Sequence, residues 1–150
     1  KGIRTKNGHS FMKQIMAETG AVFAGEHSGH YYFADNYRAD SGLIATMGVL
    51  GEMCHTGKSL SQMREPLERY ASSGEINTTV DDIHAVIERI ALDYSSYSQD
   101  RVDGLTVDCG SWWFNVRASN TEPLLRLNLE ASTRDECDTH VVELLASITA

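Results

Sequence analysis

Apolar residues recur along the first 57 residues at spacings that predict helices and strands in alternation. A helical repeat begins at Ser10, a residue type that caps helices well, and continues to about Thr19. A short apolar run at 21–24 predicts a strand, and a second helix is expected after Asp40 or Ser41. The positions expected to face a core are Phe11, Ile15 and Met16 in the first helix and Leu43, Ile44, Met47 and Leu50 in the second.

From residue 75 onward the pattern predicts the element order βαβββα, which is typical of an α+β fold with an antiparallel sheet. In the strand expected at 124–131, Leu125, Leu127 and Leu129 share one face while Arg126 lies on the other. The polar stretch 94–103 predicts a loop. The remaining expected elements are strands at 75–80, 105–109 and 112–117, a helix capped by Asp81 or Asp82 that ends near Leu92, and a last helix from Arg134 to about Ser147 that opens with the capping box Thr133–Glu136.

These elements divide the chain into three parts. Residues 1–57 are interpreted as the C-terminal part of an α/β domain, and residues 75–150 as an α+β domain. The segment 58–74 has a helical pattern but contains Pro66, which breaks a helix. We therefore expect 58–74 to be a linker helix that acts as a hinge.

Composition narrows the class of protein. A chain of 150 residues with 41% hydrophobic and 23% charged residues is expected to be globular. Its net charge of −8 argues against a nucleic-acid partner, and the chain holds no apolar run of the roughly 20 residues that cross a membrane. Cys54, Cys109 and Cys137 are widely spaced and form no CxxC pair, which favours reduced thiols in a cytoplasmic protein over a disulfide framework or a zinc site.

The segment 117–126 has the composition of an anion-binding turn. Two arginines flank hydroxyl and amide side chains, and a phosphate is bound by such short donors together with cationic charge. Pro123 favours an extended conformation before it and marks the start of the next strand. The alternative is a solvated hairpin loop whose arginines pair with carboxylates. The candidate phosphate ligands are Arg117, Ser119, Asn120, Thr121 and Arg126.

A second polar turn follows the first expected strand. Glu26 and Ser28 lie in a loop bounded by Gly25 and Gly29, where a carboxylate and a hydroxyl suit the hydroxyl groups of a sugar. His30 follows directly, and an imidazole that titrates near neutrality suits proton transfer or a bond to phosphate. Considered alone, such a loop is equally an ordinary polar turn with a hydrogen-bonded histidine.

Taken together, the two turns resemble the sugar-binding and phosphate-binding loops of the α-D-phosphohexomutases, and most closely those of bacterial phosphomannomutase/phosphoglucomutase. Further matches lie at 4–9, 31–33, 40–42 and 73–77, so the resemblance covers nearly the whole chain. It implies the end of the third domain followed by the fourth, whose fold is similar to that of the TATA-box-binding protein. The string Ser119, Asn120, Thr121 favours the mannose and glucose branch over the glucosamine branch.

The resemblance implies an isomerase that interconverts hexose 1-phosphate and hexose 6-phosphate through a hexose 1,6-bisphosphate. His9, Glu26, Ser28 and His30 match its sugar-binding and active-site residues, with His30 the candidate for proton transfer. The family's phosphoserine loop and its Mg²⁺ loop are both missing from this sequence. We therefore expect a C-terminal fragment of a phosphoprotein enzyme, which needs the parent's other domains and has no mutase activity by itself.

Two alternatives stay open at this point. The chain could be a non-catalytic module that binds sugar phosphates, although a half-domain leaves sheet edges unpaired. It could also be an interaction module whose loops have lost their ligands, and such a module would bind no phosphate.

Overall fold

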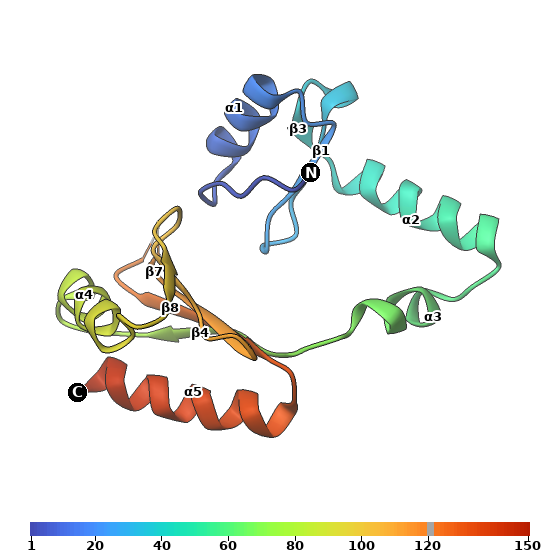
Figure 1. Cartoon of the computed structure of the whole chain (residues 1–150). Helices are drawn as coiled ribbons and strands as arrows, with labels where there is room; N and C mark the ends of the chain where they lie inside the picture. Colours follow the sequence, from blue (N-terminus) through green and yellow to red (C-terminus); the bar gives the residue numbers. More distant parts are fainter. Residues whose placement is uncertain (120–121) are drawn as a thin grey trace. The chain divides into compact units, whose positions relative to one another are not determined.

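The computed structural model describes residues 1–119 and 122–150, and the chain forms two compact units, Lys1–Leu67 and Glu68–Ala150 (Figure 1). Each unit has its own buried cluster of apolar side chains. In the described part of the chain no helix is long and apolar enough to cross a membrane.

The first unit combines helices with a small antiparallel sheet, whose strand order is β1-β2-β3. Helix α1 packs on this sheet, and Met12, Met16 and Tyr32 form the buried cluster between them. The elements are α1 (His9–Thr19), β1 (Phe23–Gly25), β2 (Tyr31–Phe33), the short 3-10 helix η1 (Ala34–Asn36), β3 (Ala39–Asp40), α2 (Gly42–Thr56), α3 (Leu60–Arg64) and the 3-10 helix η2 (Glu65–Leu67).

Helix α1 is present where the pattern predicts it, but its start and its inward face differ from the prediction. Gly8 occupies the cap position and no side chain caps the helix, so the expectation for Ser10 was wrong. Met12 and Met16 are the buried positions, whereas Phe11 is 45% exposed. Positions i and i+4 of a helix share one face, and Met12 and Met16 together contact Tyr32 on the sheet.

Helix α2 begins as predicted, because the Ser41 hydroxyl accepts a hydrogen bond from the Ile44 N–H at 3.2 Å. The prediction that one face of this helix lies in a core is wrong. None of its residues is buried, and Leu43 and Met47 are 82% and 67% exposed. Tyr31 and Phe33 of β2 line an open groove of about 830 Å³ together with α2. Within the described residues, three short strands do not provide enough surface to cover a 15-residue apolar helix.

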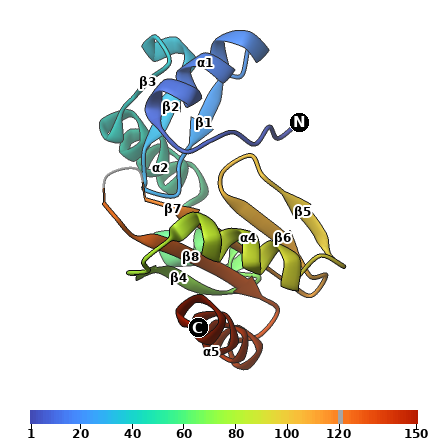
Figure 2. The ribbon, with the colours of Figure 1, turned by 90° about the vertical axis from the view of Figure 1, so that its left-hand side faces the viewer.

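The second unit is a five-stranded antiparallel sheet with two helices (Figures 1 and 2). The strand order is β4-β8-β7-β6-β5, so β7 and β8 are neighbouring inner strands of the sheet. The elements are β4 (Ala71–Thr78), α4 (Ile83–Asp93), β5 (Ser98–Asp100), β6 (Leu105–Asp108), β7 (Trp112–Ala118), β8 (Leu125–Ala131) and α5 (Arg134–Thr149).

Strict alternation along β8 separates the core from a polar face. Leu125, Leu127 and Leu129 are fully buried, and they belong to one cluster with residues of both α4 and α5. Arg126 and Asn128 lie on the opposite face, as the period of two predicts. The expected α+β class with an antiparallel sheet is therefore confirmed, and the polar face of its central strands carries the residues of interest.

Three details of the second unit differ from the sequence prediction. β4 begins at Ala71, so the end of the expected linker helix is strand. The expected loop contains β5, which makes the order βαββββα. Thr133 caps α5 by accepting the Glu136 N–H at 3.2 Å, but the Glu136 carboxylate accepts the N–H of Ser132. The capping box is therefore shifted by one residue on its return side.

The expected linker contains α3, η2 and the first residues of β4, and Pro66 lies in η2. The boundary between the two units falls within it, after Leu67. Its role as a hinge stays a prediction.

Candidate functional site

Two arginines lie directly opposite each other on the polar face of the second unit. Arg117 of β7 and Arg126 of β8 are cross-strand partners in the antiparallel register. The Arg117 side chain is only 9% exposed and that of Arg126 is 22% exposed. Like charges directly across a strand pair repel each other, so this arrangement requires a countercharge.

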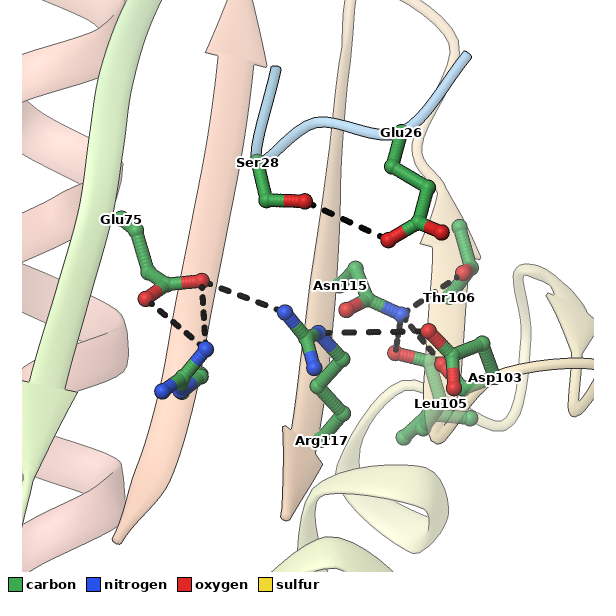
Figure 3. Close-up of polar contacts among 9 residues, drawn as sticks. Glu26, Ser28, Glu75, Asp103, Leu105, Thr106, Asn115 and Arg117 are labelled. Carbon is green, nitrogen blue, oxygen red and sulfur yellow. Dashed lines mark hydrogen bonds and ion pairs between the residues drawn. The ribbon is translucent and has the colours of Figure 1, made fainter. Parts of the chain in front are cut away.

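Glu75 of β4 supplies that countercharge. Its Oε2 accepts hydrogen bonds from Arg117 Nη2 at 3.2 Å and from Arg126 Nη1 at 3.4 Å. Its Oε1 lies 3.3 Å from Arg126 Nη1, so one carboxylate joins both guanidinium groups. Figure 3 shows the contact between Glu75 and Arg117. The two arginines and Glu75 form a cluster that we call the arginine pair site.

Asp103 is the second carboxylate beside Arg117, and its Oδ2 lies 3.9 Å from Arg117 Nε (Figure 3). The Asn115 amide fixes the same segment by donating to the backbone oxygens of Asp103 and Leu105 and to the Thr106 hydroxyl, at 2.8, 3.4 and 3.0 Å. Asn115 thus ties the segment from Asp103 to Thr106 to β7, two residues before Arg117.

The turn between β7 and β8 closes beside this pair. The Ser119 N–H donates to the carbonyl oxygen of Leu124 at 2.8 Å, so Ser119 lies at the base of the turn. The exposed carboxylate of Glu122 lies 3.7 Å from Arg126 Nη2. The predicted ligands Asn120 and Thr121 lie outside the described residues. The structure therefore brings together Arg117 and Arg126, with Ser119 two residues beyond Arg117.

The arginines are not free cations, because both pair with carboxylates. Arg117 pairs with Glu75 and Asp103, and Arg126 pairs with Glu75 and Glu122. These five side chains carry two positive and three negative charges. A phosphate that binds here must therefore compete for guanidinium donors with carboxylates, and the exposed Glu122 is the most easily displaced because its side chain is 59% exposed.

The loop between β1 and β2 positions the second group of candidates in the first unit. The Glu26 N–H donates to the His30 carbonyl oxygen at 2.9 Å, and the Gly29 N–H donates to the Glu26 oxygen at 3.0 Å. The Ser28 hydroxyl donates to Glu26 Oε2 at 3.3 Å (Figure 3). Glu26, Ser28 and His30 are therefore held in one tight turn at the end of a two-strand ladder.

A buried tyrosine orients the Glu26 carboxylate. The hydroxyl of Tyr32, a residue that is 1% exposed, donates to Glu26 Oε1 at 2.5 Å. Burial raises the pKa of Tyr32, and its bond to Glu26 raises the pKa further. The phenol thus stays protonated and keeps donating, while Glu26 Oε2 remains the oxygen directed at Ser28.

His30 pairs with Asp40 of β3 across the small sheet, with Nδ1 and Oδ2 3.0 Å apart. A hydrogen bond from His30 holds the pKa of the Asp40 carboxyl below its ordinary value of 3.8. Because an ionised carboxylate only accepts hydrogen bonds, Nδ1 carries the proton and Nε2 is the ring nitrogen available to a ligand. His9, by contrast, is the exposed first residue of α1, and its Nδ1 lies 3.5 Å from the Ser10 hydroxyl.

Four residues of these two groups are not among the predicted site residues: Tyr32, Asp40, Glu75 and Asp103. Tyr32, Asp40 and Glu75 lie in the segments 31–33, 40–42 and 73–77 that resemble the family, but the sequence assigns them no role in a site. The Ser-Ser-Gly string before Glu75 is the signal that could have found it, because a glycine inside a strand pattern often marks a bulge. No comparable signal marks Tyr32 or Asp103, whose roles depend on contacts between elements.

Residues 120 and 121 aside, no group of three or more histidine, cysteine, aspartate or glutamate side chains has the geometry to hold a metal ion. The same part of the chain has three free cysteines, Cys54, Cys109 and Cys137. The candidate functional groups of the two units are therefore carboxylate, imidazole, hydroxyl and guanidinium groups.

Two family models match the chain in succession. Residues 1–70 match the alpha/beta/alpha domain III of phosphoglucomutase/phosphomannomutase, and residues 75–147 match the C-terminal domain of the same family. The junction of the two matches lies in the segment that joins the two units.

Individual proteins give the same result. The chain is 40% identical over 142 residues to a phosphomannomutase of Methanocaldococcus jannaschii, covering 95% of this chain and 32% of that protein. It is 43% identical over 128 residues to a protein of Xanthomonas campestris pv. campestris named phosphohexose mutases, covering 83% of this chain and 29% of that protein. A crystal structure of a phosphoglucomutase/phosphomannomutase family protein from Burkholderia thailandensis superimposes with a TM-score of 0.75 at 28% identity, over 96% of this chain and 32% of that one. The chain thus spans about a third of the length of these relatives.

Proposed function

Since the chain belongs to the phosphoglucomutase/phosphomannomutase family, we propose that it is the substrate-binding C-terminal part of an enzyme that interconverts hexose 1-phosphate and hexose 6-phosphate. The substrate we assign is a phosphorylated mannose, glucose or both. The observation that carries the proposal is the arginine pair site, which lies directly beside the turn of Ser119.

In this proposal the arginine pair site holds the phosphate group that does not react. A guanidinium offers a planar set of N–H donors that matches phosphate oxygens, and Arg117 and Arg126 present two such sets side by side. Ser119, Asn120 and Thr121 complete the ligand set as a proposal. Because both ends of the hexose must take turns at this site, gripping the phosphate rather than the ring lets it accept two sugar orientations.

The turn at residues 25–30 is assigned to the sugar ring. The Tyr32 hydroxyl fixes one oxygen of Glu26, so the carboxylate has a defined orientation toward sugar hydroxyl groups. Ser28 already donates to the other oxygen, and it is exposed enough to exchange that bond for one with a ligand. A carboxylate paired with a hydroxyl suits a polyhydroxylated ligand, which both donates and accepts.

His30 is proposed as the residue of this chain that assists proton transfer, and His9 as a further ligand contact. The bond between His30 Nδ1 and Asp40 fixes the ring and leaves Nε2 as the nitrogen that is not bonded to Asp40, as in catalytic histidines oriented by a carboxylate. The structure places His9 at the start of α1 and His30 at the end of the turn, so the two histidines belong to separate elements of the first unit.

We propose a hexose 1,6-bisphosphate as the intermediate that reorients between two phosphoryl transfers. By the resemblance to the family, we assign Mg²⁺ and the phosphoserine of this phosphoprotein to the parent's remaining domains, which are its partners. The chain alone is then expected to be inactive. A cytoplasmic location is supported by its free thiols.

The test is a titration of the chain with mannose 1-phosphate, glucose 1-phosphate, inorganic phosphate and unphosphorylated mannose, followed through backbone amide NMR signals. The proposal predicts that the three phosphates shift signals between residues 117 and 126, and that only the two sugar phosphates also shift signals at 25–30. Equal responses to mannose and mannose 1-phosphate would exclude a phosphate grip. A folded chain that responds to none of the four ligands would favour an interaction module.

A further inference from the structure

We infer that Glu75 is a positioning residue of the arginine pair site: it holds Arg117 and Arg126 in the geometry that receives a phosphate. This inference rests on the function proposed for those arginines. Glu75 lies outside the turn at 119–124 and is not among the phosphate ligands predicted from the sequence.

The path of β4 shows that the fold places Glu75 on this face by means of a bulge. Ser72 pairs with Glu130 and Glu75 pairs with Asn128, so two residues of β4 lie opposite the single residue Leu129. Gly74 takes up the extra residue with a φ of 66°, a left-handed conformation that favours glycine.

The bulge decides which face Glu75 occupies. Beyond it, Ile76 pairs with Leu127 on the core side, whereas Asn77 pairs with Arg126 on the polar side together with Glu75. Without the extra residue, Glu75 would lie opposite Leu127 and its carboxylate would point at the buried core. The Ser73 hydroxyl stabilises the irregular segment by accepting the Leu129 N–H at 2.9 Å.

The geometry of the carboxylate fits a bridge between both arginines rather than an ordinary ion pair. Glu75 Oε2 is within hydrogen-bond distance of both guanidinium groups, and its side chain is only 27% exposed. It uses one terminal nitrogen of each arginine, whereas Asp103 lies 3.9 Å from Arg117 Nε and Glu122 lies 3.7 Å from Arg126 Nη2. Among the described residues, the buried Nε of Arg126 has no hydrogen-bond partner, so this arginine retains donor capacity.

Burial separates the roles of the neighbouring carboxylates. Glu122 is 59% exposed, lies 3.7 Å from Arg126 and can swing into solvent when a phosphate arrives. Glu75 lies on the edge strand β4, but its carboxylate is only 27% exposed and joins Arg117 of β7 to Arg126 of β8, so it cannot leave without separating the two arginines. The phosphate therefore displaces Glu122, while Glu75 remains as the fixed countercharge behind the two guanidinium groups.

The test compares Glu75→Gln with Glu88→Gln. Both variants replace a carboxylate that pairs with arginine in the second unit, but Glu88 pairs with Arg101 away from the arginine pair site. A glutamine keeps the size of Glu75 but has one acceptor oxygen and a donor amide, so it cannot bridge two guanidinium groups. Two readouts are measured: the Kd for mannose 1-phosphate and inorganic phosphate, and the side-chain NMR signals of Arg117 and Arg126 without ligand.

The inference predicts that Glu75→Gln weakens the binding of mannose 1-phosphate and of inorganic phosphate by about 5- to 20-fold and speeds the guanidinium rotation of both arginines. Glu88→Gln is expected to leave both readouts unchanged. Glu75→Asp, which keeps the charge with a shorter reach, is expected to recover part of the affinity. Equal or tighter phosphate binding by Glu75→Gln would overturn the inference, because Glu75 would then be a competitor of the ligand. If the unaltered chain binds no phosphate, the proposed function fails, and the arginine signals still show whether Glu75 positions the pair.

Discussion

Gly104 and Arg117 are in contact through their backbones, so closely that a Cβ on residue 104 would lie 2.5 Å from the Cβ of Arg117 and 2.4 Å from the oxygen of Val116. Gly104 also has a φ of 70°. We predict that Gly104→Ala lowers the free energy of unfolding by about 3 kcal/mol or more, because it adds a steric clash to the strain of a left-handed backbone. Urea denaturation measures this.

Gly110→Ala is the matched control, since Gly110 has a φ of 93° but nothing lies within 4 Å of the added carbon. This variant has the backbone strain without the clash and is expected to lower the free energy of unfolding by about 1–2 kcal/mol. Equal losses in the two variants would mean that the contact between Gly104 and β7 is not tight in solution.

Tyr32→Phe tests the contribution of the turn at 25–30 to ligand binding separately from that of the arginine pair site. It removes the hydroxyl that donates to Glu26 Oε1 and is expected to lower the free energy of unfolding by about 1 kcal/mol. The affinity for mannose 1-phosphate is expected to fall, whereas the affinity for inorganic phosphate stays the same. A parallel fall for both ligands would show that Tyr32 acts on the fold as a whole.

The pair of His30 and Asp40 gives a prediction for the acid range. His30 holds the pKa of Asp40 below 3.8, so ionised Asp40 stabilises the folded chain above that value, and this contribution is lost as pH falls through the lowered pKa. His30→Gln should return the pKa of Asp40 toward its ordinary value, as followed by the carboxyl carbon signal in NMR. An unchanged pKa of Asp40 in this variant would show that His30 and Asp40 do not pair in solution.

Cys109 gives the corresponding prediction in the alkaline range. Burial raises the pKa of its thiol to about 11, from an ordinary 9.0. Between these values the unfolded chain loses the thiol proton and the folded chain keeps it, so the free energy of unfolding falls as pH rises from 9 to 11. Cys109→Ala should reduce this slope in denaturation curves recorded across that range. The same slope in both chains would contradict the burial of the thiol.

Much of the second unit could be predicted from sequence because its signals are local. The alternation of Leu125, Leu127 and Leu129 with Arg126 and Asn128 is strict, and it gives both the buried face and the face of the arginine pair. The caps at Asp82 and Thr133 were likewise predicted and are present. β5 was missed because its residues are polar and lie at the sheet edge, where Gln99 bonds to the oxygens of Ala91 and Tyr94 instead of packing in the core.

The site itself is harder to derive, since its geometry depends on contacts between distant segments. Periodicity places Arg117 and Arg126 on one face, but only the register of β4 shows that Glu75 joins them across 42 and 51 positions of the chain. Helix α2 fails for a related reason. Its apolar pattern predicts a core, yet a pattern cannot show which surface is present to cover it.

The central claim is that Arg117 and Arg126 bind the phosphate of the substrate, and the Kd for mannose 1-phosphate tests it most directly. We predict that Arg117→Ala and Arg126→Ala each weaken binding by about 1.5–3 kcal/mol, while Arg101→Ala, which breaks only the pair with Glu88, leaves the Kd unchanged. Amide spectra show whether each variant remains folded. Folded variants of Arg117 and Arg126 that bind mannose 1-phosphate as tightly as the unaltered chain would contradict the account.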